Sequence, residues 1–288
     1  MKTDPFAQSM SIRAKANNLS KKLGIAPQAA LQSYFAGRFL SRLAVSEYAS
    51  RMAVKGGTLM SALFGIAERT TMDIDTTILD FPGDEASIHS VIQKICKIDI
   101  SDGIAFSVDA SKPITKDDTY GGYGFSLMAT IGTIRLSLGI DVTVGDVVTP
   151  APERLEFKNV MGDTGNICLL AYTTETVLAE KLQTVLKRGA LTTRPRDFYD
   201  IHKIVTAKMF RPEILRNAIR ATFQNRNSTD LIPKREEIVN RIHASAFIRD
   251  QWMRYQKQFT YAKSITLETV LGSVTSLFPY FPAATRKS

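Results

Sequence analysis

The sequence predicts a mixed α/β fold in which a sheet core follows N-terminal helices and precedes a C-terminal helical bundle. Residues 8–48 are expected to be helical, because Leu and Phe recur there at three- and four-residue steps. From about residue 52 to 171, short apolar runs are separated by turns that contain Gly, Pro or Asp, a pattern typical of strands. After residue 173 the helical spacing returns. We therefore expect two domains, 1–172 and 173–288.

The first helical region should break at Gly24, which suits a helix end, and resume at Pro27, which suits a first turn. The expected strands are 52–54, 74–79, 104–110, 124–131 and 133–144, and helices at 57–66 and 84–98 lie between them. Further helices are expected at 174–188, 196–207, 212–224, 233–257 and 264–276. Thr173 or Thr174 can cap the first of these.

Composition narrows the class of protein. The chain is 44% hydrophobic and 23% charged, as an ordinary globular protein is, and no apolar run approaches the roughly 20 residues that span a bilayer. The N-terminus lacks a hydrophobic signal core, so a cytoplasmic protein with no membrane partner is expected. Two distant cysteines and three histidines have no metal-ligand spacing, which argues against a zinc site.

The positive charge of the chain is concentrated in its last third. Residues 201–288 contain 15 Lys and Arg against 6 Asp and Glu, whereas residues 1–200 contain 22 of each. This asymmetry indicates a polyanionic partner, with RNA or DNA ahead of a membrane. A solvated helical surface would explain it equally well.

A glycine turn provides the first candidate site. Gly56 and Gly57 lack a Cβ, so their backbone can approach a phosphate closely, and Thr58 can donate a hydrogen bond to it. A helix that starts here would direct its N-terminal dipole at the same phosphate. Arg69 could neutralise further negative charge just before the next strand. These residues predict a nucleotide-binding turn.

Acidic residues on two strands predict a metal site beside that turn. Asp73 and Asp75 are two residues apart on one expected strand, so their side chains point the same way. Asp141 lies on the polar face of another strand, near its end, and could supply a third carboxylate. Carboxylates are ligands that Mg²⁺ or Mn²⁺ prefers, and such ions activate a hydroxyl and stabilise leaving pyrophosphate. Solvent exposure is the alternative explanation.

A third segment contains Lys181 on an apolar helix, followed by Asp197 and Asp200 at the start of the next helix. Lys181 is a candidate ligand for triphosphate oxygens. The alternative is structural: Asp197 would cap its helix, and a buried salt bridge would join this acidic pair to Lys181 or Arg196. From spacing alone, the structural alternative is favoured.

Together these segments resemble the AbiEii/AbiGii-type toxins, which are nucleotidyltransferases with a DNA polymerase β-like fold. The resemblance spans roughly residues 15–210. It rests on KGGT at 55–58, RTTMDID at 69–75, IDVTVGD at 140–146, ETVLAEKLQTVLKRG at 175–189 and RPRDFYDI at 194–201.

The resemblance implies roles for individual residues. Asp73 and Asp75 would hold Mg²⁺, and Asp141 would match the family's second acidic strand. Lys181 would contact the triphosphate, and Asp200 would be the essential acidic residue of the last motif. The glycine turn would bind the phosphates of the incoming nucleoside triphosphate (NTP), which is the substrate.

The resemblance also implies a toxin of a toxin–antitoxin or abortive-infection (phage-defence) system, with a cognate antitoxin protein as partner. The expected activity transfers nucleotides from NTP to RNA, with the tRNA 3′ end as the expected acceptor, which would block translation. We expect a monomer when no antitoxin is bound. Two alternatives remain open: a protein nucleotidylyltransferase or kinase-like toxin, and a non-catalytic partner of an antitoxin that binds GTP or ATP.

Overall fold

The computed structural model describes residues 4–114, 121–146, 148–162 and 164–282. The chain forms two compact units. The first contains Met1–Asp146 and Glu153–Ala171, and the second contains Val147–Pro152 and Tyr172–Ser288. Each unit is described by itself below.

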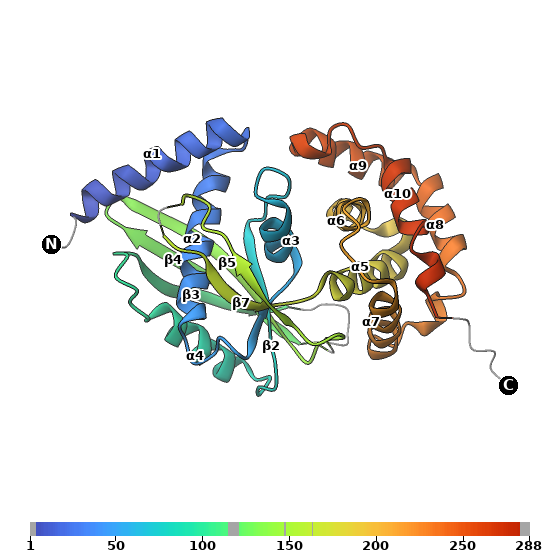
Figure 1. Ribbon diagram of the computed structural model, residues 1–288, viewed down its shortest axis with the longest axis horizontal. Helices are drawn as coiled ribbons and strands as arrows, with labels where there is room; N and C mark the ends of the chain where they lie inside the picture. The colour runs from blue at the N-terminus through green and yellow to red at the C-terminus, as the bar shows by residue number, and fades with distance from the viewer. Residues whose placement is uncertain (1–3, 115–120, 147, 163, 283–288) are drawn as a thin grey trace. The chain divides into compact units, whose positions relative to one another are not determined.

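The first unit contains a mixed sheet with helices packed on it (Figure 1). Its helices are α1 (Pro5–Leu23), α2 (Pro27–Ala44), α3 (Gly56–Phe64) and α4 (Glu85–Cys96). Its strands are β1 (Met52–Val54), β2 (Asp73–Ile78), β3 (Ala105–Pro113), β4 (Gly122–Ile131), β5 (Ile134–Val144), β6 (Glu153–Phe157) and β7 (Ile167–Ala171).

The seven strands are ordered β3-β4-β5-β2-β1-β7-β6. The central pairs β2–β5 and β1–β7 are parallel, and the remaining pairs are antiparallel. The mixed α/β class predicted from the sequence is therefore confirmed. The strands β6 and β7 were not predicted. They extend the sheet on the β1 side.

The break between the N-terminal helices falls where the sequence predicts, whereas the outer ends differ from the predicted range 8–48, because α1 begins at Pro5 and α2 ends at Ala44. Gly24 adopts the left-handed conformation, with φ of 67°, and its N–H closes α1 by bonding the carbonyl of Ser20. Pro27 occupies the first position of α2. Helix α2 contacts α1, α4, β5 and β7, so it covers the middle of the sheet. Phe35 and Phe39 of α2 are fully buried in that contact layer.

Arg38 and Arg42 of α2 are buried charged residues that pair with Asp102. Burial alone would raise the pKa of Asp102, but hydrogen bonds from Arg42 and Arg38 outweigh it and hold that pKa below its usual value. The carboxylate also accepts the N–H of Ile104 at 3.0 Å. This network fixes α2 to the loop that enters β3.

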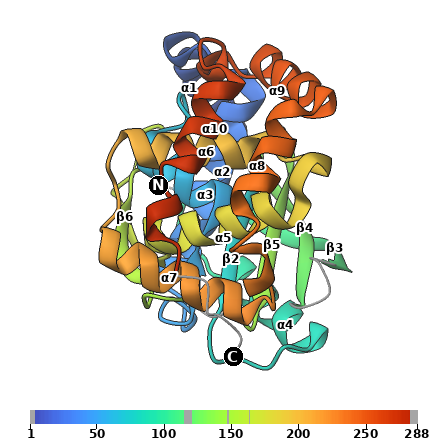
Figure 2. The same cartoon turned by 90° about the vertical axis from the view of Figure 1, so that its right-hand side faces the viewer.

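The second unit is mainly helical (Figures 1 and 2). Its α-helices are α5 (Thr174–Arg188), α6 (Pro195–Thr206), α7 (Pro212–Asn225), α8 (Arg235–Ala244), α9 (Ala246–Gln258) and α10 (Leu267–Thr275). Helix α5 contacts α6, α7 and α8, and α6 also contacts α9 and α10. Thr173, one of the two capping residues that the sequence allows, caps α5 by accepting the N–H of Thr176.

The single helix predicted for residues 233–257 is wrong, because two helices occupy this range. The break falls at Ser245, whose backbone is extended and whose hydroxyl accepts the N–H of Ile248. Ser245 therefore ends α8 and caps α9. Helical apolar spacing on both sides of one cap cannot be distinguished by periodicity from a continuous helix.

Across the residues that the structure describes, no helix combines the length and apolar character needed to cross a membrane.

Candidate active site on the sheet of the first unit

The glycine turn lies where β1 passes into α3. Lys55 is extended, Gly56 takes a positive φ of 54°, and α3 begins at Gly56. The N–H of Gly57 donates a hydrogen bond to Oδ2 of Asp75 at 2.7 Å. A Cβ placed on Gly56 would lie 2.6 Å from the same oxygen. Only glycine therefore allows the helix start to sit this close to the carboxylate.

Thr58 joins α3 to the acidic strand. Its Oγ1 accepts the N–H of Asp75 at 2.9 Å and donates to the carbonyl of Asp73 at 3.1 Å. The residue is buried. Because this hydroxyl is engaged by the backbone of β2, it holds the helix start against the strand. The predicted contact between the Thr58 hydroxyl and a phosphate stays a prediction.

The acidic residues of β2 and β5 share one face of the sheet. Asp75 is directly opposite Asp141 in the parallel β2–β5 pair, and Asp73 is opposite Gly139. Residues paired in this way point to the same side, on strands about 4.8 Å apart. All three acidic residues that the sequence singled out therefore belong to one face, and residues 66 positions apart in the chain become neighbours.

Glycines leave room for these carboxylates. A Cβ at Gly139 would lie 2.3 Å from Oδ1 of Asp73, and a Cβ at Gly124 would lie 3.2 Å from Oδ1 of Asp141. Each carboxylate thus occupies the space that a side chain on the next strand would fill. Gly124 of β4 and Gly139 of β5 leave this space.

Arg69 lies beside the glycine turn. The residue is 3% exposed, and its Nη1 donates to the carbonyl of Thr70 at 2.5 Å. Its Nη2 is 3.3 Å from the position that a Cβ on Gly57 would occupy. The guanidinium charge is therefore held close to Gly57 of the turn. The predicted contact of Arg69 with phosphate stays a prediction.

A buried ion pair that the sequence analysis missed lies under the turn. The ammonium of Lys55 pairs with Asp146 and also donates to Oγ1 of Thr143 at 2.5 Å. Both charged side chains are at most 9% exposed. The signal that could have revealed the pair is a lysine directly after the apolar strand Met52–Val54, where burial demands a partner.

Lys181 belongs to the second unit, where it forms a buried cluster with two acidic residues. Its Nζ lies 2.7 Å from Oδ1 of Asp197 and 2.8 Å from Oδ2 of Asp200. Asp200 is fully buried and Asp197 is 3% exposed. Arg194 adds a contact to Asp197 at 2.9 Å. The structure therefore brings Lys181 and Asp200 together, as the sequence allowed.

The expected capping role of Asp197 is wrong. Helix α6 begins after Arg194 without a side-chain cap, and Asp197 is instead committed to Lys181 and Arg194. Burial alone would raise the pKa of Asp197, but the charge of Lys181, followed by that of Arg194, outweighs it and holds the pKa far below its usual value. The carboxylate is therefore ionised at neutral pH.

The carboxylate face has the donor chemistry for a hard divalent cation. Asp73, Asp75 and Asp141 offer oxygen ligands on adjacent strands, the kind that Mg²⁺ and Mn²⁺ take. Among the described residues no group of three or more acidic, His or Cys side chains is already gathered closely enough to hold an ion. Asp75 is instead turned toward the Gly57 N–H. The residues fit such an ion in type and in strand position.

The chain is similar to several solved structures at low sequence identity. A protein from H. pylori, described as a candidate nucleotidyltransferase, is 14% identical with a TM-score of 0.49, over 88% of this chain and 96% of its own. JHP933 from Helicobacter pylori is 13% identical with a TM-score of 0.48, over 88% and 93%. An antigenic nucleotidyltransferase-like protein from Paracoccidioides brasiliensis is 15% identical with a TM-score of 0.38, over 76% and 93%.

No curated protein sequence matches the chain. The model of one protein family, the nucleotidyl transferase AbiEii toxin of type IV toxin–antitoxin (TA) systems, matches residues 38–274. This range includes the glycine turn, the carboxylates of β2 and β5, and the Lys181 cluster. The chain therefore belongs to the AbiEii family of nucleotidyltransferase toxins.

Proposed function

We propose that this nucleotidyltransferase uses a divalent metal ion to transfer nucleotides from an NTP to the 3′ end of RNA, with tRNA as the acceptor. The observation that carries the proposal is the pairing of Asp75 with Asp141 on parallel strands, directly beside the glycine turn at the start of α3. Membership of the AbiEii family supports nucleotide transfer as the reaction class.

In the proposed site, Asp73, Asp75 and Asp141 would hold Mg²⁺ or Mn²⁺, which would supply charge stabilisation for the triphosphate. Gly56, Gly57 and Arg69 would bind the phosphates of the NTP. The acceptor 3′ oxygen would form a bond to the α-phosphorus as the bond to the bridging oxygen breaks. Pyrophosphate would leave, and the hydroxyl proton would pass to a carboxylate of the site.

We also propose that Lys181 and Asp200 serve this reaction, as the family resemblance implies. Lys181 would contact the triphosphate, and Asp200 would keep its ammonium charged and oriented. The 2.7 and 2.8 Å contacts of Lys181 to two carboxylates support the positioning part of this proposal.

RNA is the proposed acceptor because the charge of residues 173–288 is strongly positive. Arg216 and Arg220 are exposed one turn apart on α7, and α9 adds exposed Arg249, Arg254 and Lys257. Phosphate contacts from such residues provide affinity that falls steeply with salt. We propose that the protein acts in the cytoplasm as a toxin that stops translation by modifying tRNA. A cognate antitoxin would restrain it, and the pair would act in phage defence.

The test supplies the full-length protein with Mg²⁺, total tRNA and NTPs labelled at either the α- or the γ-phosphate. Label from the α-phosphate should appear on RNA, and tRNA whose 3′ end has been oxidised with periodate should stay unlabelled. Asp73→Asn and Asp141→Asn should lose the activity. Asp109→Asn, which changes an exposed aspartate on β3, is the matched control and should retain it.

Each other result identifies a different activity. Transfer of γ-label would show a kinase, and α-label on protein would show a protein nucleotidylyltransferase. If no label is transferred to any acceptor while Asp73→Asn stays fully toxic in cells, the catalytic proposal is refuted and a non-catalytic partner of the antitoxin remains.

A further inference from the structure

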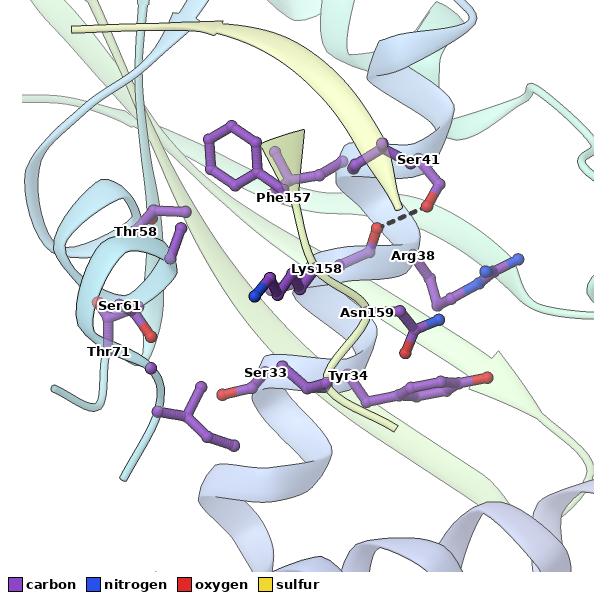
Figure 3. Close-up of a pocket in the computed structure, with 18 of the residues that line it drawn as sticks. Ser33, Tyr34, Arg38, Ser41, Thr58, Ser61, Thr71, Phe157, Lys158 and Asn159 are labelled. Atoms are coloured by element: carbon purple, nitrogen blue, oxygen red, sulfur yellow. Dashed lines mark hydrogen bonds between the residues drawn. The ribbon is translucent and has the colours of Figure 1, made fainter. Parts of the chain in front are cut away.

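A pocket of about 330 Å³ lies within the first unit, between α2, α3 and the segment that joins β6 to β7 (Figure 3). Its walls are mainly apolar, and the largely buried Tyr34 and Phe157 are among the lining residues. Hydroxyl groups of Ser33, Ser61 and Thr71 are distributed among them. A volume near 300 Å³ with apolar walls and a few polar groups is typical of a site for a small ligand or one nucleotide.

Among the described residues that line the pocket, one cation is available to an anionic ligand. Lys158 lines it and extends toward α3 in Figure 3, and its ammonium has no hydrogen-bond or ion-pair partner among the described residues. Arg38, which also lines the pocket, is already committed to Asp102 at 2.8 Å and to Thr164 at 3.0 Å. Lys158 is therefore the side chain suited to offset a phosphate charge here.

The pocket adjoins one end of the carboxylate face. Asp73, Thr58 and Thr71 are among its lining residues, whereas Gly56, Gly57, Asp75 and Asp141 are not. A ligand in the pocket would thus reach Asp73 without occupying the glycine turn. This separates the pocket from the groups that are proposed to bind the triphosphate.

We propose that this pocket receives the unpaired terminal nucleotide of the acceptor RNA, an inference that rests on the proposed function. In phosphoryl transfer the attacking and leaving oxygens lie roughly in line, on opposite sides of the phosphorus. Because pyrophosphate would leave along the glycine turn, the acceptor nucleotide needs a separate binding site that is still close to the proposed metal site. The pocket beside Asp73 meets that requirement.

The chemistry of the walls matches a nucleotide of a single strand. Unstacked RNA bases bind by stacking on aromatic side chains and by hydrogen bonds to their edges. The aromatic residues Tyr34 and Phe157 are among the lining residues, and the serine and threonine hydroxyls offer donors and acceptors. Lys158 can neutralise the phosphate of the same nucleotide.

The first experiment asks where the terminal base lies. A short single-stranded RNA with 4-thiouridine at its 3′ end is irradiated with the full-length protein, and 4-thio-UTP is irradiated in parallel. We expect the RNA to cross-link to peptides that contain Tyr34 or Phe157, and we expect 4-thio-UTP to cross-link elsewhere. Cross-linking of 4-thio-UTP to those peptides in place of the RNA would overturn the proposal, because the pocket would then hold the base of the NTP.

The second experiment fills the pocket. Ala62 of α3 lines the pocket and is exposed, so Ala62→Phe can project a ring into the space without disturbing the core. Ala86→Phe, at an exposed alanine of α4 that does not line the pocket, is the matched control. Lys158→Ala is compared in the same way with Lys97→Ala, an exposed lysine at the end of α4.

Ala62→Phe should abolish the RNA cross-link and raise the KM for acceptor RNA by about fivefold to a hundredfold, the effect of losing one base stack. Lys158→Ala should raise the KM and reduce its dependence on salt. The Kd for NTP and the thermal stability should stay those of the wild type. Both control variants should behave as wild type in every measurement.

Failure of this inference can be told apart from failure of the proposed function. If wild type labels RNA but Ala62→Phe keeps the cross-link and the wild-type KM, the pocket proposal is refuted and the function stands. If no RNA is labelled and the terminal base does not cross-link to the pocket, both are refuted. A cross-link that Ala62→Phe removes, without any transfer to RNA, supports the pocket as an RNA site and refutes the transfer reaction.

Discussion

The sharpest prediction concerns Gly139, the residue of β5 that faces Asp73 across the β2–β5 pair. In Gly139→Ala the new Cβ would lie 2.3 Å from Oδ1 of Asp73, whereas ordinary contact begins at 3.4 Å. The carboxylate oxygen must therefore retreat by about 1 Å, a displacement that can cost about a hundredfold in rate when it affects a catalytic group. We expect a loss of that size in nucleotide transfer.

The same substitution should hardly change stability. Turning the Asp73 side chain off its preferred rotamer costs about 0.5–1.5 kcal/mol, and replacing glycine by alanine returns about 0.4–1 kcal/mol through the unfolded state. The free energy of unfolding, measured with urea, should thus stay within about 1 kcal/mol of wild type. Loss of activity without loss of stability is the signature of a displaced carboxylate.

The matched control is Ser137→Ala, which places the same alanine on the same strand and face, two residues earlier. Ser137 is exposed and its hydroxyl contacts that of Ser126 at 3.2 Å, so little should change. If Gly139→Ala transfers nucleotides at the wild-type rate while Asp73→Asn is inactive, the position of the Asp73 carboxylate does not limit the reaction. The argument from close packing would then be refuted.

Three further predictions follow from buried or reactive groups. Lys181→Met leaves Asp197 and Asp200 without their buried cation and should lower the free energy of unfolding by about 3–5 kcal/mol. If urea unfolds this variant with the same free energy as the wild type, the cluster does not support the fold. The pKa of Asp197 is lower in the folded state than the ordinary 3.8, so the ionised carboxylate stabilises the fold at neutral pH, and this stabilisation is lost as pH falls below about 4. Asp197→Asn should therefore reduce the difference between the free energies of unfolding measured with urea at pH 7 and at pH 3. An unchanged difference would contradict this prediction. Burial raises the pKa of Cys96 to about 12, so a thiol reagent at pH 8 should modify only the exposed Cys168 in the native protein. After denaturation the reagent should modify both cysteines. Rapid modification of two thiols in the native protein would count against the buried position of Cys96.

The parts of the fold that the sequence predicted are those marked by strong local signals. Gly24 and Pro27 delimit α1 and α2, and Thr173 starts α5, because capping depends on a few neighbouring residues. The strand β6 was missed because its five residues include three charged ones, so no apolar alternation marks it. The strand β7 is short, and an apolar run of that length does not distinguish a strand from a helix segment.

The candidate site also contains parts that the sequence could predict from local patterns and parts that depend on the three-dimensional fold. The glycine turn and the Asp73–Asp75 pair are local patterns, so the sequence could identify them. The pairing of Asp75 with Asp141 depends on strand register, and the ion pair of Lys55 with Asp146 depends on three-dimensional burial. For Lys181 the sequence left two alternatives, and the structure shows its ammonium in contact with the carboxylates of Asp197 and Asp200. The contact of Lys181 with triphosphate stays a prediction.

The hydrogen bond from Gly57 to Asp75 has a consequence for the order of binding. This amide can serve one strong acceptor at a time, and in the free protein a carboxylate is that acceptor at 2.7 Å. An incoming anion therefore competes with the protein's own side chain and meets the repulsion of its charge. A free phosphate should be excluded, whereas a ligand that arrives with a cation to engage Asp75 removes the competitor as it binds. The protein should thus discriminate against bare anions through an acceptor that belongs to its own strand β2.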